Sequence, residues 1–130
     1  AGVGTPGYWK NHPEAWPVER LWSGGTFYTK EKAIEWMNTP VAGDKTITMF
    51  KAFVAAFLNR KSDCCVPYNY FPRYNCVSAA REWLKMYPVG SGEKANSEAW
   101  QYSHGEEIYF CLDDYNNGFF DCAPSRDSLE

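Results

Sequence analysis

Two imidazole side chains could carry acid-base or metal chemistry near neutral pH, those of His12 and His104. His12 ends a motif formed by Tyr8, Trp9, Lys10, Asn11 and His12. No nucleophile stands beside His12 in the sequence, so a hydrogen-bonded structural histidine in an aromatic turn is the favoured interpretation. A metal-dependent hydrolase around His12 is an alternative, and His104 would contribute to such a site only if the fold brings the two together.

A second candidate for chemistry is the acidic stretch from Asp113 to Gly118, where carboxylate and amide oxygens precede a glycine as in calcium loops. The spacing fits poorly, because Tyr115 stands at the third ligand position and the twelfth position holds no Glu. The stretch is more typical of a helix that ends in a left-handed glycine. Asp113 and Asn117 are kept as calcium candidates, and no cofactor is otherwise expected.

The aromatic residues are the third candidate, since six Trp, nine Tyr and eight Phe occur in 130 residues. Aromatic rings bury large areas in cores and also contact sugars and proteins. Four of the tryptophans are predicted to lie in the core: Trp9, Trp16, Trp36 and Trp83. The segment 66–74 has no helical period, and its rings are predicted to form an exposed binding interface: Tyr68, Tyr70, Phe71 and Tyr74.

Five cysteines occur in the C-terminal half, and none forms a C-x-x-C pair: Cys64, Cys65, Cys76, Cys111 and Cys122. Disulfides therefore fit better than a zinc site and indicate a secreted domain. Because five is odd, one thiol stays free, joins a partner chain or is capped. A bridge between adjacent cysteines strains the peptide, so only one of Cys64 and Cys65 is expected in a long-range bridge.

Length and charge exclude several classes of protein. A chain of 130 residues suggests a single domain, 1–130. Thirteen Lys and Arg against 16 Asp and Glu give a net charge of −3 without a basic run, so nucleic acid is not an expected partner. The longest apolar stretch, Phe53 to Leu58, is too short to span a membrane. The start at Ala1 is interpreted as the processed end of a secreted chain.

The elements that position these residues are mainly helical. Residues 1–29, rich in Gly and Pro, are predicted to be irregular and anchored by aromatic rings. Helices are predicted from Lys30 to Asn38 after an N-cap at Thr29, and from Lys45 to Arg60 after Asp44. The second of these carries the longest apolar stripe and is expected at the centre of the core.

The C-terminal half is predicted to contain a helix that starts after Asn75 or Ser78 and runs through Tyr87. Further helical stretches are expected from Asn96 to Tyr102 and from Glu106 to Tyr115. The predicted fold class is thus mainly α, a small disulfide-stabilised helical domain with a long irregular N-terminal segment and loops.

Five segments together resemble a family of secreted microbial domains that open on the motif TPGYWKNH. They are Gly4 to Pro17, Pro40 to Thr46, Tyr87 to Gly92, Leu112 to Gly118 and Cys122 to Arg126. They span nearly the whole chain in consistent order. The resemblance implies an extracellular location and no particular reaction.

The resemblance also implies a disulfide pattern, in which Cys76 pairs with Cys122. Cys111 would then pair with Cys64 or Cys65. The bridged set is assigned as Cys76, Cys122, Cys111 and Cys64, which leaves Cys65 as the free or intermolecular thiol.

The function favoured by the sequence is that of a non-catalytic secreted module with a structural or self-assembly role at the cell surface or in the extracellular matrix. Its expected partners are copies of itself, matrix or glycan. A carbohydrate-binding domain with exposed aromatic residues is the first alternative, and the metal-dependent hydrolase around His12 is the second.

Overall fold

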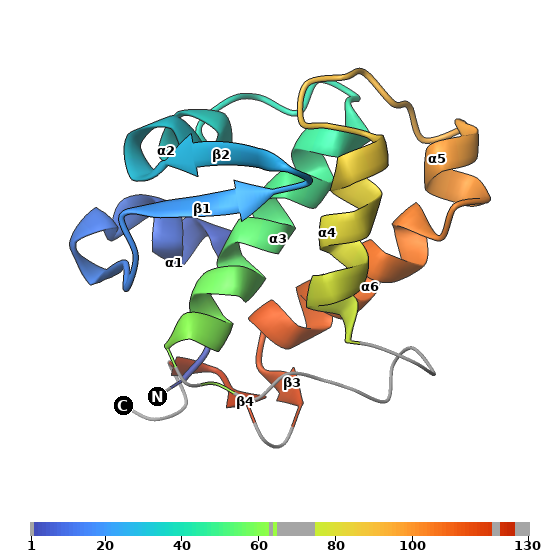
Figure 1. The fold of residues 1–130 in the computed structure, drawn as a ribbon. Helices are drawn as coiled ribbons and strands as arrows, with labels where there is room; N and C mark the ends of the chain where they lie inside the picture. Colours follow the sequence, from blue (N-terminus) through green and yellow to red (C-terminus); the bar gives the residue numbers. More distant parts are fainter. Residues whose placement is uncertain (1, 63, 65–74, 121–122, 127–130) are drawn as a thin grey trace.

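The fold is mainly helical, as the sequence predicts, in a computed structural model that describes residues 2–62, 64, 75–120 and 123–126 (Figure 1). The helices are α1 (Pro6–Asn11), α2 (Lys30–Met37), α3 (Lys45–Lys61), α4 (Cys76–Met86), α5 (Glu98–Gln101) and α6 (Gly105–Asn116), with a 3-10 turn η1 (Pro13–Ala15). The strands are β1 (Arg20–Ser23), β2 (Thr26–Thr29), β3 (Phe119–Phe120) and β4 (Ala123–Pro124). No helix in the described part is long and apolar enough to cross a membrane.

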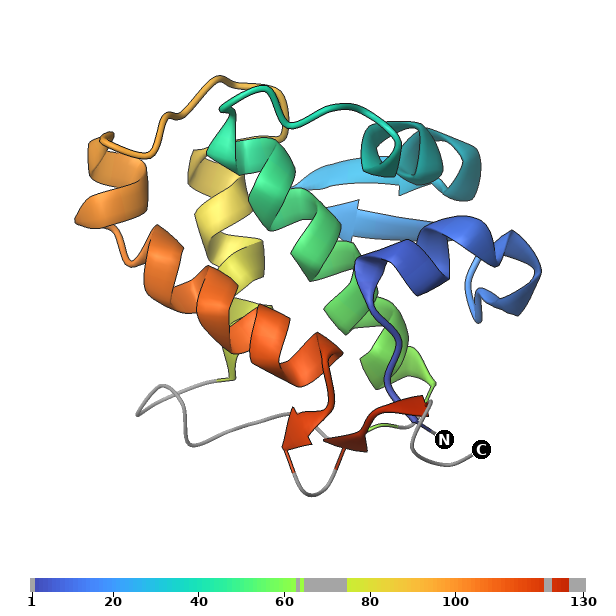
Figure 2. The ribbon, with the colours of Figure 1, turned by 180° about the vertical axis from the view of Figure 1, so that it is seen from behind.

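Helix α3 is the centre of the core, as predicted. Twelve of its 17 residues are buried, and it contacts α1, α2, α4 and α6. Figures 1 and 2 show the β1–β2 hairpin on one side of α3 and α6 on the other. The helix can be surrounded because its buried residues include three alanines, Ala52, Ala55 and Ala56, which let neighbouring elements approach closely.

The helices α2, α3 and α4 begin directly after the capping residues predicted from the sequence. The side chain of Thr29 accepts a hydrogen bond from the backbone N–H of Lys32, and that of Asp44 accepts one from Thr46. Of the two caps considered for α4, Asn75 is the one used, and it accepts from the backbone N–H of Ser78. Each such cap contributes about 1 kcal/mol by satisfying a donor that the helix itself leaves unpaired.

The β1–β2 hairpin is an element that the sequence-based expectations do not include. Its antiparallel strands pair from Arg20 opposite Thr29 to Ser23 opposite Thr26. Gly24 and Gly25, with φ of 58° and 86°, form the two-residue turn. Gly24 also lies against the backbone of α4, since a Cβ there would come 2.4 Å from the carbonyl oxygen of Leu84.

A buried amide, that of Asn59 in α3, holds the N-terminal motif on the core. Its Oδ1 accepts hydrogen bonds from the backbone N–H of Gly4 at 2.7 Å and from the indole N–H of Trp9 at 3.0 Å. Its Nδ2 donates to the carbonyl of Gly4 at 3.0 Å and to Oδ1 of Asn116 in α6 at 2.9 Å. Asn116 in turn donates to the carbonyl of Ala52 at 3.0 Å. Every described group of this network therefore has a partner.

The two ends of the described chain are also joined. The backbone N–H of Val3 donates to the carbonyl of Pro124, and that of Arg126 donates to the carbonyl of Val3. The Arg126 side chain donates to the carbonyl of Gly2 at 3.0 Å, and its guanidinium lies 4.3 Å from the centre of the Tyr8 ring. The first and last described segments thus lie side by side beneath α3 (Figures 1 and 2).

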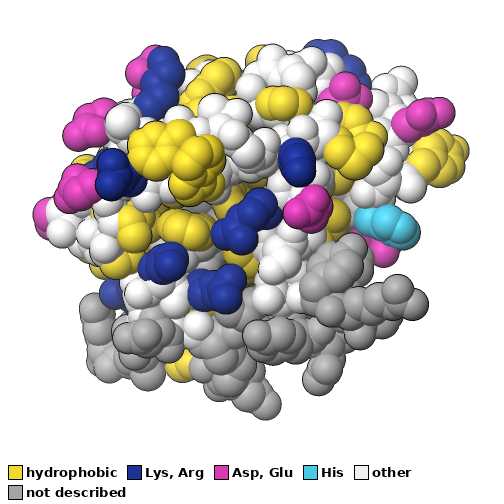
Figure 3. All heavy atoms as spheres, in the orientation of Figure 1, with side chains coloured by type: hydrophobic (Ala, Val, Ile, Leu, Met, Phe, Trp, Pro, Cys, Tyr) yellow, Lys and Arg dark blue, Asp and Glu magenta, His cyan; other side chains and the backbone are white. Residues whose placement is uncertain are grey.

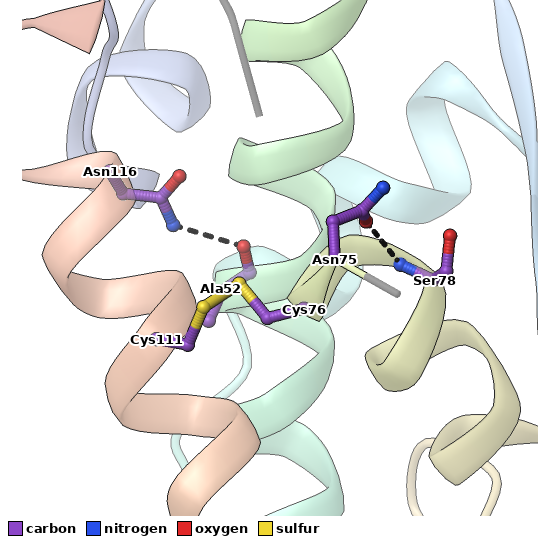
Figure 4. Close-up of a disulfide and its surroundings, with 6 residues drawn as sticks. All are labelled: Ala52, Asn75, Cys76, Ser78, Cys111 and Asn116. Carbon is purple, nitrogen blue, oxygen red and sulfur yellow. Dashed lines mark hydrogen bonds between the residues drawn. A yellow bond between two sulfur atoms is a disulfide. The ribbon is translucent and has the colours of Figure 1, made fainter. Parts of the chain in front are cut away.

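The disulfide corrects the predicted pairing. Cys76 bonds to Cys111, with 6.1 Å between their Cα atoms (Figure 4). Pairing of Cys76 with Cys122, and of Cys111 with Cys64 or Cys65, is therefore wrong. The physical reason is the packing of α4 against α6, which buries both sulfur atoms at one helix contact. Cys64 is buried. Cys122 and Cys65, the predicted free or intermolecular thiol, lie outside the described residues.

The Asn59 network predicts a large loss of stability when Asn59 is replaced by Ala. The change leaves the polar groups of Gly4, Trp9 and Asn116 buried without this partner, and we expect the free energy of unfolding in urea to fall by about 3 kcal/mol or more. Asn96→Ala is the control, because Asn96 is exposed, and it should change the free energy by less than about 0.5 kcal/mol. Similar losses for both variants would contradict the role given to Asn59.

The disulfide predicts a cross-linked peptide that joins Cys76 to Cys111 in a non-reducing digest analysed by mass spectrometry. Because the bridge closes a segment of 35 residues, the Cys76→Ala, Cys111→Ala double variant should lose about 3 to 4 kcal/mol of unfolding free energy. Recovery of a Cys76 to Cys122 peptide from the native protein would show that the pairing is wrong.

Candidate functional site

A surface hollow beside exposed aromatic rings lies between the β1–β2 hairpin and helices α3 and α4, and we call it the hairpin groove. Its volume is about 420 Å3. It is lined by Val18, Arg20, Leu21 and Trp22 from the hairpin side, Phe57 and Lys61 from α3, and Arg81 from α4. Leu21 and Phe57 are buried and give the groove an apolar floor.

Two aromatic rings stand beside this groove on the outer face of the hairpin. Trp22 and Phe27 are cross-strand partners whose rings meet edge to face, with centroids 5.0 Å apart. Trp22 is 58% exposed and Phe27 41% exposed. They point outward because successive side chains of a strand alternate, and Leu21 occupies the inward position. A pair of large exposed rings of this kind is typical of a binding surface.

Three cations surround the apolar floor: Arg20, Lys61 and Arg81. Each lies over an aromatic ring, at 5.4 Å from Phe27, 5.6 Å from Phe57 and 5.9 Å from Phe53 respectively. Within the described chain the ion pairs are those of Lys32 with Glu35 and of His104 with Glu107, so none of the three cations is paired with a described carboxylate. Figure 3 shows Lys and Arg side chains around apolar ones on the face that carries the hairpin and α4.

The described residues that line the groove offer apolar surface and positive charge. Apolar rings and cations can hold a ligand by stacking and by charge.

The predicted motif from Tyr8 to His12 has a packing role in the structure. Trp9 is 1% exposed, and its carbonyl accepts a hydrogen bond from the indole of Trp16 at 2.8 Å. The ring of His12 stacks on Tyr8 with centroids 4.3 Å apart, and its Nδ1 lies 2.8 Å from the Tyr8 carbonyl oxygen. Lys10 is partly buried and Asn11 is exposed. His12 is thus the hydrogen-bonded histidine of an aromatic turn.

The structure does not bring His12 and His104 into one metal site. Nδ1 of His104 lies 3.4 Å from a carboxylate oxygen of Glu107, on the first turn of α6. Among the residues that the structure describes, no group of three or more His, Cys, Asp or Glu side chains could hold a metal ion.

The calcium candidates Asp113 and Asn117 lie at the end of α6, as the helix-end interpretation predicts. The Asn117 side chain donates to the backbone carbonyl of Asp113 at 2.8 Å, and Gly118 follows with a φ of 79°. Partial burial, and after it the charge of Asp114, raises the pKa of the Asp113 carboxyl, while a hydrogen bond from Asn117 opposes this shift.

The aromatic predictions divide into two groups. The core assignment is confirmed, since Trp9, Trp16 and Trp83 are buried and Trp36 packs against the core. The predicted interface of Tyr68, Tyr70, Phe71 and Tyr74 lies outside the described residues.

The exposed pair of Trp22 and Phe27 is not among the predicted binding residues, although the sequence carries a signal for it. Gly24-Gly25 separates two short runs rich in aromatic and β-branched residues, which is a hairpin signature. A hairpin with this turn places Trp22 directly opposite Phe27.

Comparisons of this chain with protein-family models, with curated proteins and with solved structures find no match. The resemblance to the TPGYWKNH family therefore stays a prediction.

The raised pKa of Asp113 predicts a pH-dependent effect of Asp113→Asn. Since the fold favours the protonated carboxyl, ionisation of Asp113 destabilises the protein as pH rises from the usual value of 3.8 through the raised one. The neutral variant should melt at a higher temperature than the parent at pH 7, by less than about 3 °C because the side chain is only partly buried. At pH 3 the two proteins should melt at the same temperature. Glu82→Gln, at an exposed carboxylate, is the control. A difference that does not change with pH would contradict this cause.

Proposed function

We propose that this protein is a non-catalytic extracellular module that binds carbohydrate in the hairpin groove. The observation that carries the proposal is the exposed edge-to-face pair of Trp22 and Phe27 beside an apolar hollow. Aromatic faces stack on the apolar C–H faces of sugar rings, and a tryptophan supplies a large rigid surface at low entropic cost.

The volume of the groove matches a ligand segment of one or two sugar rings. Its volume of about 420 Å3 lies in the range of small-molecule pockets and has room for one or two sugar rings. The apolar floor of Leu21 and Phe57 suits the C–H face of a sugar ring, while the open side leaves room for a chain to continue.

The position of the groove on rigid elements supports binding without a closing step. Trp22 and Phe27 are held by strand pairing, and the turn of their hairpin rests on α4 at Leu84. A surface fixed in this way loses little conformational entropy when a ligand binds.

An extracellular location is supported by the bond between Cys76 and Cys111, because disulfides persist in oxidising compartments and are rare in the cytosol of most organisms.

Self-assembly is the competing proposal. The sequence features that suggest it are the aromatic rings of 66–74 and the odd cysteine, and they lie outside the described residues. The exposed Trp22 and Phe27 would be covered in such an assembly, so sedimentation velocity over a wide concentration range separates the two proposals. A stable oligomer that Trp22→Ala dissociates would favour self-assembly over sugar binding at this surface.

Affinity electrophoresis and calorimetry against soluble glucan, xylan, mannan and polygalacturonate test the carbohydrate proposal. We expect binding to at least one of them, and a loss of affinity of about tenfold for Trp22→Ala and a smaller loss for Phe27→Ala. Phe110→Ala is the matched control, because Phe110 is 50% exposed on α6 and does not line the groove. No binding to any of the four, or equal losses for Phe27→Ala and Phe110→Ala, would contradict the proposal.

A further inference from the structure

We infer that the hairpin groove selects acidic carbohydrate, a chain of uronic acid residues whose carboxylates pair with Arg20, Lys61 and Arg81. This inference rests on the proposed function and adds the chemical class of the ligand. It starts from the juxtaposition of an apolar floor with three cations that have no described counter-ion.

The charge of the groove is opposite in sign to that of the chain. The sequence carries a formal charge of −3, yet the lining residues of the groove hold three positive charges and no negative one. Like charges gathered around one hollow repel each other, and an anionic ligand relieves that repulsion as it binds. A neutral ligand would leave the repulsion in place.

Arg81 is an additional indication. It lines the groove, its guanidinium lies over the ring of Phe53, and no described carboxylate pairs with it. A carboxylate is the acceptor that matches an arginine best, because its two oxygens can accept two parallel N–H bonds. An anion held in the groove would therefore neutralise a guanidinium that no described carboxylate neutralises.

The rings limit which anion fits. The charged end of Lys61 lies over Phe57 within the groove, and that of Arg20 lies over Phe27 beside it, so positive charge and apolar surface are adjacent at this site. A uronic acid offers both features in one unit, since its ring has a C–H face and its C5 position carries a carboxylate. A simple polyanion matches only the cations, and a neutral sugar matches only the rings.

The test compares one oligosaccharide in two charge states. Tetragalacturonate and its methyl ester have the same rings, and only the first is charged. We expect the acid to bind at least tenfold more tightly than the ester, with an affinity that falls as salt is raised. Equal affinities would overturn the inference and leave the proposed function standing, whereas no binding to either sugar or to the neutral polysaccharides would overturn the proposed function.

Substitutions of the three cations test whether the groove causes the preference for the acid over the ester. Lys61→Gln and Arg20→Gln should each weaken acid binding about three- to tenfold and weaken ester binding by a smaller factor, while Trp22→Ala should weaken both to a similar extent. Lys94→Gln removes an exposed lysine that does not line the groove and serves as the control. Arg81→Lys keeps the charge and removes the planar fork, so it should weaken acid binding as well. Losses equal to that of Lys94→Gln would overturn the assignment.

Two further polyanions identify the source of the negative charge. Polyglutamate carries carboxylates without sugar rings, and dextran sulfate carries sulfate esters on sugar rings. We expect both to bind more weakly than galacturonate of equal charge. Polyglutamate binding as tight as that of galacturonate would overturn the carbohydrate part, and tighter binding of dextran sulfate would overturn the choice of a carboxylate.

Discussion

The rest of the structure depends on one pair of buried amides, those of Asn59 and Asn116. Placing two amides in an apolar core is costly unless they are hydrogen-bonded, and in this protein they are bonded to each other, to Gly4, to Trp9 and to the helix backbone. The pair fixes the N-terminal motif on the central helix and ties that helix to α6. Its geometry leaves little freedom for the segment that carries Gly4, where a Cβ would come 2.6 Å from the Tyr8 ring.

This anchoring gives the opening motif a physical explanation that requires no catalysis. Trp9 is held from α3, and its own carbonyl holds the indole of Trp16, which directs the chain towards the hairpin. The hairpin then rests on α4 at Gly24. A series of packing contacts thus runs from the buried amides to the hairpin that carries Trp22, and it connects the groove to the core.

The helical part of this architecture could be predicted from sequence because its signals are local. Thr29, Asp44 and Asn75 cap helices, and the apolar period of α3 marks its place in the core. The disulfide could not be predicted in this way, because the contact of Cys76 with Cys111 exists only once α4 packs on α6. The groove has the same origin, since its residues come from three segments up to about sixty positions apart.

The joined ends of the described chain have a mechanical consequence. The segments at Val3 and Ser125 run parallel, so a tension applied through the two termini pulls them in opposite directions along their length. The bonds from Val3 to Pro124 and from Arg126 to Val3 are then loaded in shear and must break together, while an antiparallel pairing at the same place would open one bond at a time. A domain held in this way resists stretching at its paired terminal segments, before the force reaches the core.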